Sequence, residues 1–172
     1  MVTGATGVLG GAAARGLADA GAAIGIVTRS VGRAGSFADE LRGAGADVLV
    51  LPADVLEEAA LASARDRVLE RWGRIDILVN AAGGNVPGST VGERPFFELP
   101  LDSFDDVFRL NLDGTLLPIR AFGAAMLEEP FPDGGRSIVN FSSMAARRAM
   151  TRVVGYGAAK AAVDNLTRWL AV

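Results

Sequence analysis

The sequence of 172 residues contains no cysteine and no histidine. Without cysteine no disulfide can form, and without both residue types Ser-His-Asp and Cys-His nucleophilic catalysis are excluded. Zinc sites built from cysteine and histidine are excluded as well, and we expect no metal site. Any catalysis must therefore use other side chains.

Basic charge is scarce relative to acidic charge, and long apolar runs are missing. The chain has 17 lysine and arginine residues against 20 aspartate and glutamate residues, a net charge of -3. This balance argues against a protein that binds nucleic acid or an anionic membrane surface. No apolar run approaches the ~20 residues of a membrane span, and no basic signal-peptide segment is present. We therefore expect a cytoplasmic protein.

Half of the residues are apolar and 22 are glycine, and a chain of this length can bury a core, so residues 1–172 are expected to form one domain. Short apolar strands alternate with helical patterns, which is typical of a parallel sheet covered by helices on both faces. Strands are expected at 1–2, 22–28, 48–51, 75–80 and 136–141. Helices are expected at 8–20, 30–43, 57–72, 101–127 and 153–171, with a long loop over 83–100. Ser30 is expected to cap the second helix, and Pro118 should kink or interrupt the fourth.

A glycine-rich turn follows the first expected strand and opens the first helix. Such a turn lets the backbone approach a pyrophosphate, whose charge the helix N-terminus stabilises. The motif is a weak signal alone, but its position between strand and helix is the one that a dinucleotide site needs. The candidate cofactor contacts in this turn are Gly4, Thr6, Gly7, Val8, Leu9 and Gly10.

The end of the second expected strand bears on the choice of cofactor. An NAD site usually has an acidic residue there to hold the ribose hydroxyls, but this chain has Thr28-Arg29-Ser30. Arg29 and Ser30 would accept a 2′-phosphate, which favours NADP over NAD, although Arg29 could equally be a solvated residue at a helix start. Asp54, next to Val55 after the third strand, could bind an adenine amino group or cap the following helix.

The single tyrosine and the single lysine of the chain lie four residues apart, at Tyr156 and Lys160. Residues i and i+4 share one face of a helix, so the phenol and the ammonium can point into one site. A neighbouring cation favours a phenolate and makes a phenol usable as a general acid or base. Lysine suits this role better than arginine because its charge is compact.

Taken together, these features resemble the short-chain dehydrogenase/reductase family over the whole length of the chain. Asn80-Ala81-Ala82-Gly83 is similar to the family's Asn-Ala-Gly signature, and Asn111 matches its helix asparagine. Ser143 lies thirteen residues before Tyr156, which is the family's spacing for its catalytic serine. Each motif alone is loose, but their common order is specific.

The resemblance implies a Rossmann-type doubly wound parallel sheet and hydride transfer between NAD(P) and an alcohol or ketone. It implies that Tyr156 transfers the proton and that Lys160 assists it and binds the nicotinamide ribose. It further implies that Ser143 donates to the substrate oxygen and that Asn111 orders a water. Asn80 would bond and pack around the central sheet near the cofactor.

Two departures from the family pattern keep alternatives open. The glycine spacing is that of the extended, epimerase-like branch, so an epimerase-like enzyme is one alternative. The family also continues beyond the helix of Lys160 with further strands and a lid. The resemblance thus implies a chain truncated at both ends, with a sheet incomplete on its C-terminal side. A catalytically incomplete nucleotide-binding fragment is the second alternative.

Substrate and partner are indicated by fewer residues. The sequence around Asn85 and Met144, with Arg152 before the tyrosine, is similar to a subgroup that includes D-mannonate and fructuronate oxidoreductases. Arg152 could hold the carboxylate of a sugar acid, although an exposed basic loop of Arg147, Arg148 and Arg152 is the interpretation that we favour. The resemblance also implies a homo-oligomer formed through helices 101–127 and 153–171.

Overall fold

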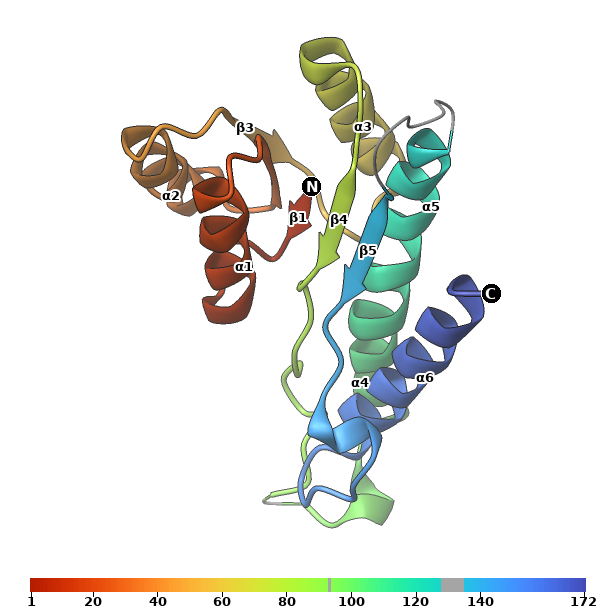
Figure 1. The fold of residues 1–172 in the computed structure, drawn as a ribbon. Helices are drawn as coiled ribbons and strands as arrows, with labels where there is room; N and C mark the ends of the chain where they lie inside the picture. The colour runs from red at the N-terminus through yellow and green to blue at the C-terminus, as the bar shows by residue number, and fades with distance from the viewer. Residues whose placement is uncertain (93, 128–134) are drawn as a thin grey trace.

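Five parallel strands form one sheet in the computed structural model, which describes residues 1–92, 94–127 and 135–172 (Figure 1). Their order is β3-β2-β1-β4-β5, and each strand pairs in parallel with its neighbour. The expected fold class is therefore confirmed. The strands are β1 (Val2–Thr3), β2 (Ile24–Thr28), β3 (Val48–Pro52), β4 (Ile77–Asn80) and β5 (Ser137–Asn140).

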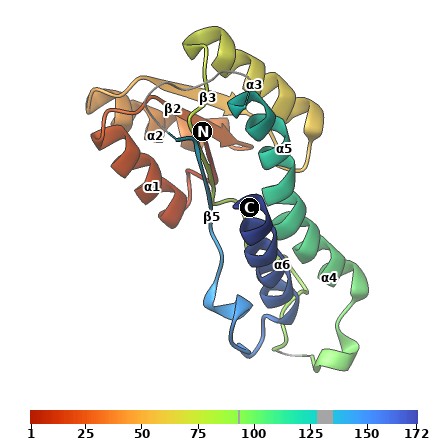
Figure 2. The ribbon, with the colours of Figure 1, turned by 45° about the vertical axis from the view of Figure 1, so that its right-hand side comes forward.

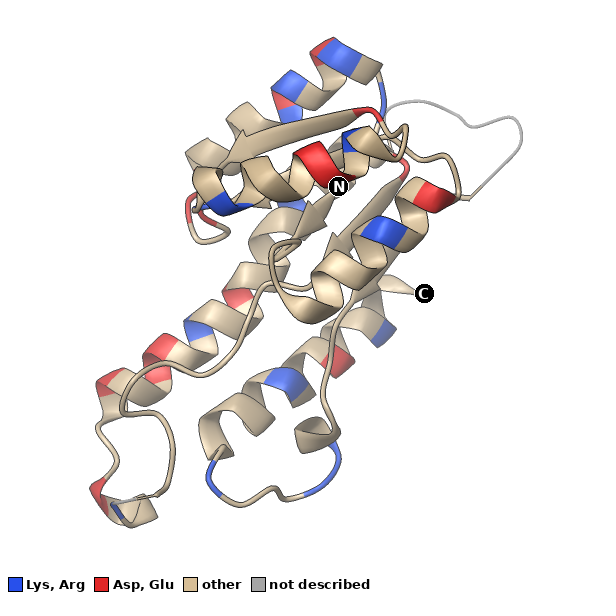
Figure 3. Ribbon diagram, turned by 90° about the vertical axis from the view of Figure 1, so that its left-hand side faces the viewer, with Lys and Arg blue, Asp and Glu red and all other residues tan. Residues whose placement is uncertain are grey.

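Helices cover both faces of this sheet (Figure 2). One apolar cluster joins α1 (Val8–Asp19) and α2 (Val31–Gly43) to one face. A second cluster joins α3 (Glu58–Trp72) and α5 (Gly114–Met126) to the other. The strands contain no charged residue, as expected for a parallel sheet that helices cover, although β5 is partly exposed. Charges lie on helices and loops (Figure 3).

The expected helix 101–127 is not continuous, and the position predicted for its interruption was wrong. An α-helix, α4 (Leu101–Phe108), runs into a π-helical turn, η2 (Arg109–Asp113), before α5 begins. Pro118 lies inside α5. Proline cannot donate to the carbonyl four residues earlier, which belongs to Gly114, the first residue of α5. The helix nevertheless continues through Pro118.

The remaining elements are short or lie at the C-terminal end. The expected loop 83–100 contains a short 3-10 helix, η1 (Phe96–Glu98), and includes residue 93, which lies outside the described residues. After β5 come a second 3-10 helix, η3 (Met144–Ala146), and α6 (Val154–Leu170). Among the helices in the described ranges, none is both long and apolar enough to cross a bilayer.

The carboxyl ends of the parallel strands lie at one edge, where β4 and β5 point toward the beginning of α6 (Figure 1). The chain leaves β1 for β2 on one side, while β4 lies on the other side. In such sheets ligands bind outside the strand ends at this change of direction. The loops after β1 and β4 are therefore the place to look for a cofactor site.

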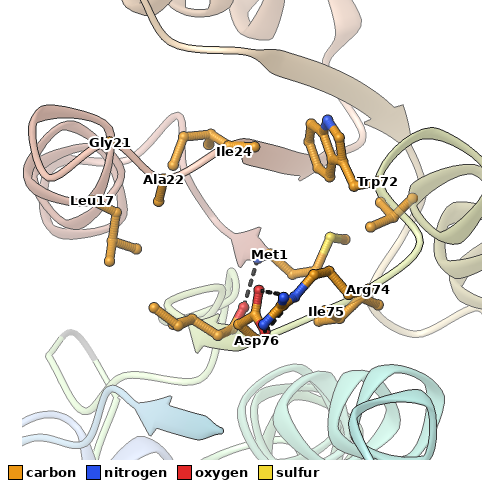
Figure 4. A pocket seen from close by; sticks show the side chains of 12 residues that line it. Met1, Leu17, Gly21, Ala22, Ile24, Trp72, Arg74, Ile75 and Asp76 are labelled. Atoms are coloured by element: carbon orange, nitrogen blue, oxygen red, sulfur yellow. Dashed lines mark hydrogen bonds and ion pairs between the residues drawn. The ribbon is translucent and has the colours of Figure 1, made fainter. Parts of the chain in front are cut away.

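A cavity of about 370 Å³ lies at the opposite edge, where the strands begin (Figure 4). Its wall is mainly apolar, and the Arg74 guanidinium pairs with the Asp76 carboxylate at 2.7 Å. The Met1 amino group donates to the Ile77 carbonyl at 2.7 Å, and burial lowers its pKa to about 6. This cavity is remote from the predicted site residues.

Candidate active site

The glycine-rich turn packs directly against the segment that follows β4. Gly4 has φ +66°, and a Cβ on it would lie 2.6 Å from the Ala82 nitrogen. The buried Thr3 hydroxyl reinforces this contact by accepting hydrogen bonds from the amides of Ala81 and Ala82, at 3.2 and 3.3 Å. Only glycine allows this approach, and it leaves a backbone cradle between the ends of β1 and β4.

A pocket of about 250 Å³ opens beside this cradle. The predicted cofactor residues that line it are Gly4, Thr6, Gly7, Arg29, Ser30, Val55, Ala81, Ala82 and Gly83. Thr28, which precedes Arg29 at the end of β2, also lines it. Residues that the sequence did not single out complete the wall, namely Val27, Arg33, Ala53 and Leu110. The lining brings together segments from β1, β2, β3, β4 and η2, which suits an extended ligand with a diphosphate at its centre.

The predicted contacts Val8, Leu9 and Gly10 form the first turn of α1 rather than the pocket wall. Val8 and Leu9 are 88% and 63% exposed, and the first turn carries no acidic residue. Gly10 packs against the Gly4 carbonyl, where a side chain would not fit. An anion would thus meet the helix N-terminus without repulsion.

At the ends of β2 and β3 the predicted residues bind one another. Arg29 Nη1 lies 3.4 Å from Asp54 Oδ2, while Asp54 Oδ1 accepts a hydrogen bond from the Leu56 amide at 3.0 Å. Asp54 therefore closes a local turn, and its predicted role as cap of α3 is wrong. Ser30 precedes α2 but its side chain makes no capping bond, so that part of the prediction is wrong; its hydroxyl accepts from Arg33 Nε at 3.2 Å.

Lys160 and Tyr156 share one face of α6, as their spacing predicts. The Lys160 ammonium lies 5.8 Å from the centroid of the Tyr156 ring, within the range of a cation–π contact. Lys160 is only 4% exposed, and its Nζ donates to the Phe141 carbonyl at 2.8 Å. Burial lowers the pKa of Lys160, since desolvation disfavours the charged amine.

Asn111 lies in the π-helical turn and is fully buried. Its amide nitrogen donates to the carbonyls of Gly84 and Val107 at 2.8 and 2.7 Å, and its amide oxygen accepts from the Gly84 amide at 3.0 Å. The side chain thus holds the loop after β4 and uses both of its amide hydrogens, so a water would have to bind an oxygen, either Oδ1 or the backbone carbonyl. That carbonyl accepts one bond from the Thr115 hydroxyl at 2.9 Å and has a second lone pair.

Ser143 stands at the beginning of η3, which packs against α6. Its hydroxyl accepts a hydrogen bond from the Ala145 amide at 3.1 Å and can still donate. A Cβ on Gly157 would lie 2.9 Å from the Ala145 carbonyl oxygen. This close contact, next to Tyr156 in the chain, brings Ser143 to the end of α6 that carries the tyrosine.

Asn80 lies behind the pocket, at the end of β4. It is 1% exposed and donates to Asn140 Oδ1 at 2.9 Å, while its own Oδ1 has no donor within the described part of the chain. This placement fits a residue that bonds around the sheet rather than one that contacts a ligand.

The substrate candidates come from two loops at the same end of the molecule. Asn85 and Met144 are exposed. Arg152 has φ +82°, the one positive φ among the non-glycine residues described, and its carbonyl accepts a hydrogen bond from the Val91 amide at 2.8 Å. Within the described ranges no three His, Cys, Asp or Glu side chains are grouped to hold a metal.

Comparison with known proteins agrees with this geometry. The family described as "short chain dehydrogenase" matches residues 1–172. The oxidoreductase UxuB of Bacillus subtilis (strain 168), itself uncharacterised, is 36% identical over 181 residues, which span 100% of this chain and 64% of the relative. The D-threitol dehydrogenase of Mycolicibacterium smegmatis is 37% identical over 171 residues, 99% of this chain and 62% of the relative.

A crystal structure of a proposed D-mannonate oxidoreductase from Haemophilus influenzae, with bound NAD, has the same fold with a TM-score of 0.90. It is 36% identical in sequence, and the match covers 98% of this chain and 63% of that one. The chain therefore spans somewhat less than two thirds of the length of these relatives.

Proposed function

Because the chain belongs to the short-chain dehydrogenase family, we propose that it transfers a hydride between a nicotinamide nucleotide and a secondary alcohol or ketone. The observation that carries the proposal is the buried Lys160 ammonium, which lies 5.8 Å from the Tyr156 ring and next to Gly83 of the pocket wall. A bound nicotinamide nucleotide supplies the hydride donor or acceptor. The reaction also transfers one proton to or from the substrate oxygen, and the side chains of the site carry out this transfer.

Tyr156 is the group that gives or takes this proton. The Lys160 ammonium lies 5.8 Å from the centroid of its ring. Phe141 accepts one of the three ammonium hydrogens, which leaves two for a ribose hydroxyl and for a water held by the Asn111 carbonyl. The Ser143 hydroxyl donates to the substrate oxygen, where negative charge develops.

The glycine cradle and the pocket residues hold the nucleotide. We propose NADP(H) rather than NAD(H), because the end of β2 lacks an acid and two arginines, Arg29 and Arg33, line the pocket there. Arg29 would exchange its exposed ion pair with Asp54 for a 2′-phosphate, and exposed pairs of this kind contribute little. The Haemophilus protein was crystallised with NAD, so the preference of this chain has to be tested by measuring the binding of both nucleotides.

The proposed substrate is a sugar acid or related polyol. The names of the Haemophilus and Mycolicibacterium relatives point to this class, and Arg152 offers a guanidinium for a carboxylate. Rates on hexuronates, aldonates and neutral polyols test this proposal. A carboxylate requirement that Arg152→Ala weakens is the expected result, and equal rates on neutral polyols would refute it.

A nucleotide-binding unit without turnover is the second candidate, and one observation favours it. β5 ends the strand order within the described residues and pairs only with β4, and its Val139 is 45% exposed. In longer relatives more chain is available to complete the site. Turnover by the purified 172-residue protein decides between the two, since the second candidate predicts nucleotide binding without product.

We also propose that the protein is a homo-oligomer through the segments 101–127 and 153–171. These segments carry exposed apolar side chains, with Leu101 79%, Leu127 80% and Trp169 74% exposed. Sedimentation analysis is the test. A monomer at micromolar concentration would contradict the proposal, and a dimer that Trp169→Glu dissociates would support it.

A further inference from the structure

The face of α6 that carries Tyr156 and Lys160 extends two turns beyond the lysine. Val163 and Thr167 follow at spacings that keep them on this face, because seven residues make close to two helical turns. Val163 is fully buried and Thr167 is half-buried. The orientation of Thr167 around the helix axis is therefore tied to that of Lys160.

The two ends of α6 are held differently. Close to Tyr156, the helix packs on α4, η2 and η3. The last turns carry exposed side chains, Trp169 and Leu170 being 74% and 40% exposed, and Leu166 is the residue there that packs on the core. The C-terminal half of α6 therefore has little apolar contact with the sheet to hold it.

A chain of hydrogen bonds attaches this half of the helix to the sheet. Asn80 Nδ2 donates to Asn140 Oδ1 at 2.9 Å, across the β4–β5 register that pairs these two residues. Asn140 Nδ2 then donates to the Thr167 hydroxyl oxygen at 2.9 Å. The Thr167 hydroxyl donates to the Val163 carbonyl at 2.8 Å. The chain thus runs from the centre of the sheet into the helix of the catalytic pair.

The chemistry of these groups fixes which one donates and which one accepts in each hydrogen bond. The Thr167 hydroxyl has one hydrogen, which Val163 takes, so toward Asn140 the hydroxyl can only accept. Asn140 must therefore turn its amide nitrogen to α6 and its oxygen to Asn80. Loss of the hydroxyl would leave the half-buried Asn140 amide without this acceptor and remove the hydrogen bond that ties α6 to β5.

We propose that Asn140 and Thr167 are positioning residues, which set the rotation of α6 so that Lys160 and Tyr156 face the nucleotide pocket. The catalytic meaning of this role rests on the proposed function, while the positioning itself does not. Lys160 donates to Phe141, the residue after Asn140. Both hydrogen bonds therefore join α6 to the same short segment, two helical turns apart.

The single lysine of the chain provides a direct measurement. Labelling with ¹⁵N-lysine gives one Nζ resonance, whose pH titration reports the environment of Lys160. In Thr167→Val, which keeps the shape but removes the hydroxyl, we expect the Lys160 pKa to rise toward its ordinary value as water reaches the ammonium. Thr167→Ser keeps the hydroxyl and should titrate like wild type. Ser137→Ala is the matched control, because Ser137 lines, together with Asn140 and Thr167, a cavity between α5, β5 and the end of α6.

Turnover adds a second readout. Thr167→Val should lower kcat about fivefold, which corresponds to one hydrogen bond in net terms, and should leave the KM for nucleotide unchanged. An unchanged Nζ titration in Thr167→Val, and in Thr167→Ala if the first variant does not fold, would overturn the proposal. If the wild type shows no turnover but Thr167→Val still moves the Nζ titration, positioning is upheld and the proposed function fails.

Discussion

A methyl group on Gly83 would lie 3.3 Å from the Lys160 ammonium and 2.6 Å from Asn111 Oδ1. Gly83 therefore leaves open the space between the loop after β4 and the two polar side chains of the site. Because φ of Gly83 is +154°, an added side chain would also strain the backbone, by roughly 1–3 kcal/mol.

Gly83→Ala should consequently lower kcat/KM at least ~10-fold and weaken nucleotide binding. The matched control is Gly84→Ala. Gly84 has a similar φ, +145°, but open space where its Cβ would be. The control variant should share the loss of stability without the clash. Equal kinetic losses in the two variants would show that backbone strain, and not the space beside Lys160, is what matters.

Tyr156→Phe should lower kcat by about 10²–10⁴-fold, the usual contribution of a general acid or base. The dissociation constant of the nucleotide, measured by calorimetry, should change little, because the variant loses a proton donor and keeps the ring. Lys160→Arg should impair both quantities, since a planar guanidinium does not replace a compact ammonium. Wild-type turnover in Tyr156→Phe would remove this tyrosine from the mechanism.

Arg29→Ala should weaken NADP(H) binding by about 10-fold or more, the value of a charge-assisted hydrogen bond, and leave NAD(H) binding unchanged. Calorimetric titration of both nucleotides measures this difference. Arg65→Ala serves as the control, because Arg65 lies on α3 and pairs with the neighbouring Asp66. Tighter binding of NAD(H) than of NADP(H) by the wild type, unaffected by Arg29→Ala, would contradict the predicted preference.

The buried lysine should also make stability depend on pH. Burial lowers the Lys160 pKa below 10.5, so just below pH 10.5 the unfolded chain binds more protons than the folded chain. The free energy of unfolding should therefore gain a contribution as pH rises through this window and lose it as pH falls.

Lys160→Met should lack this contribution and be at least as stable as wild type at pH 7, because no ammonium has to be buried. Urea unfolding of both proteins between pH 7 and 10 provides the test. The chain has no other lysine, so the difference between the two curves belongs to Lys160. Parallel curves would show that burial of the Lys160 ammonium does not lower the free energy of unfolding.

Local spacing was sufficient to predict the Tyr156–Lys160 face, because residues four apart on a helix are neighbours whatever surrounds them. The strand and helix alternation likewise predicted the parallel sheet. Asn111 could be singled out, but its partner Gly84 lies 27 residues away and is reached only through an irregular turn. The sequence carries no local signal for that turn, and the predicted break was wrongly placed at Pro118.

Residues that act through distant partners were missed for the same reason. Arg33 enters the pocket because α2 begins beside the strand ends, although its spacing of four from Arg29 was a usable signal. Asn140 and Thr167 meet 27 residues apart. In the sequence both are ordinary polar residues. Their connection follows only from the β4–β5 register, which places Asn80 opposite Asn140.

The π-helical turn at Arg109–Asp113 amounts to one residue more than an α-helix would need. Deleting a single residue there would restore a regular α-helix. The turn absorbs its extra residue locally, so α4 and α5 would keep the faces that they bury. The backbone that places Asn111 opposite Gly84 would change, and with it the hydrogen bonds between them. Chain length within this one turn is therefore under tighter constraint than the chemistry of its exposed side chains.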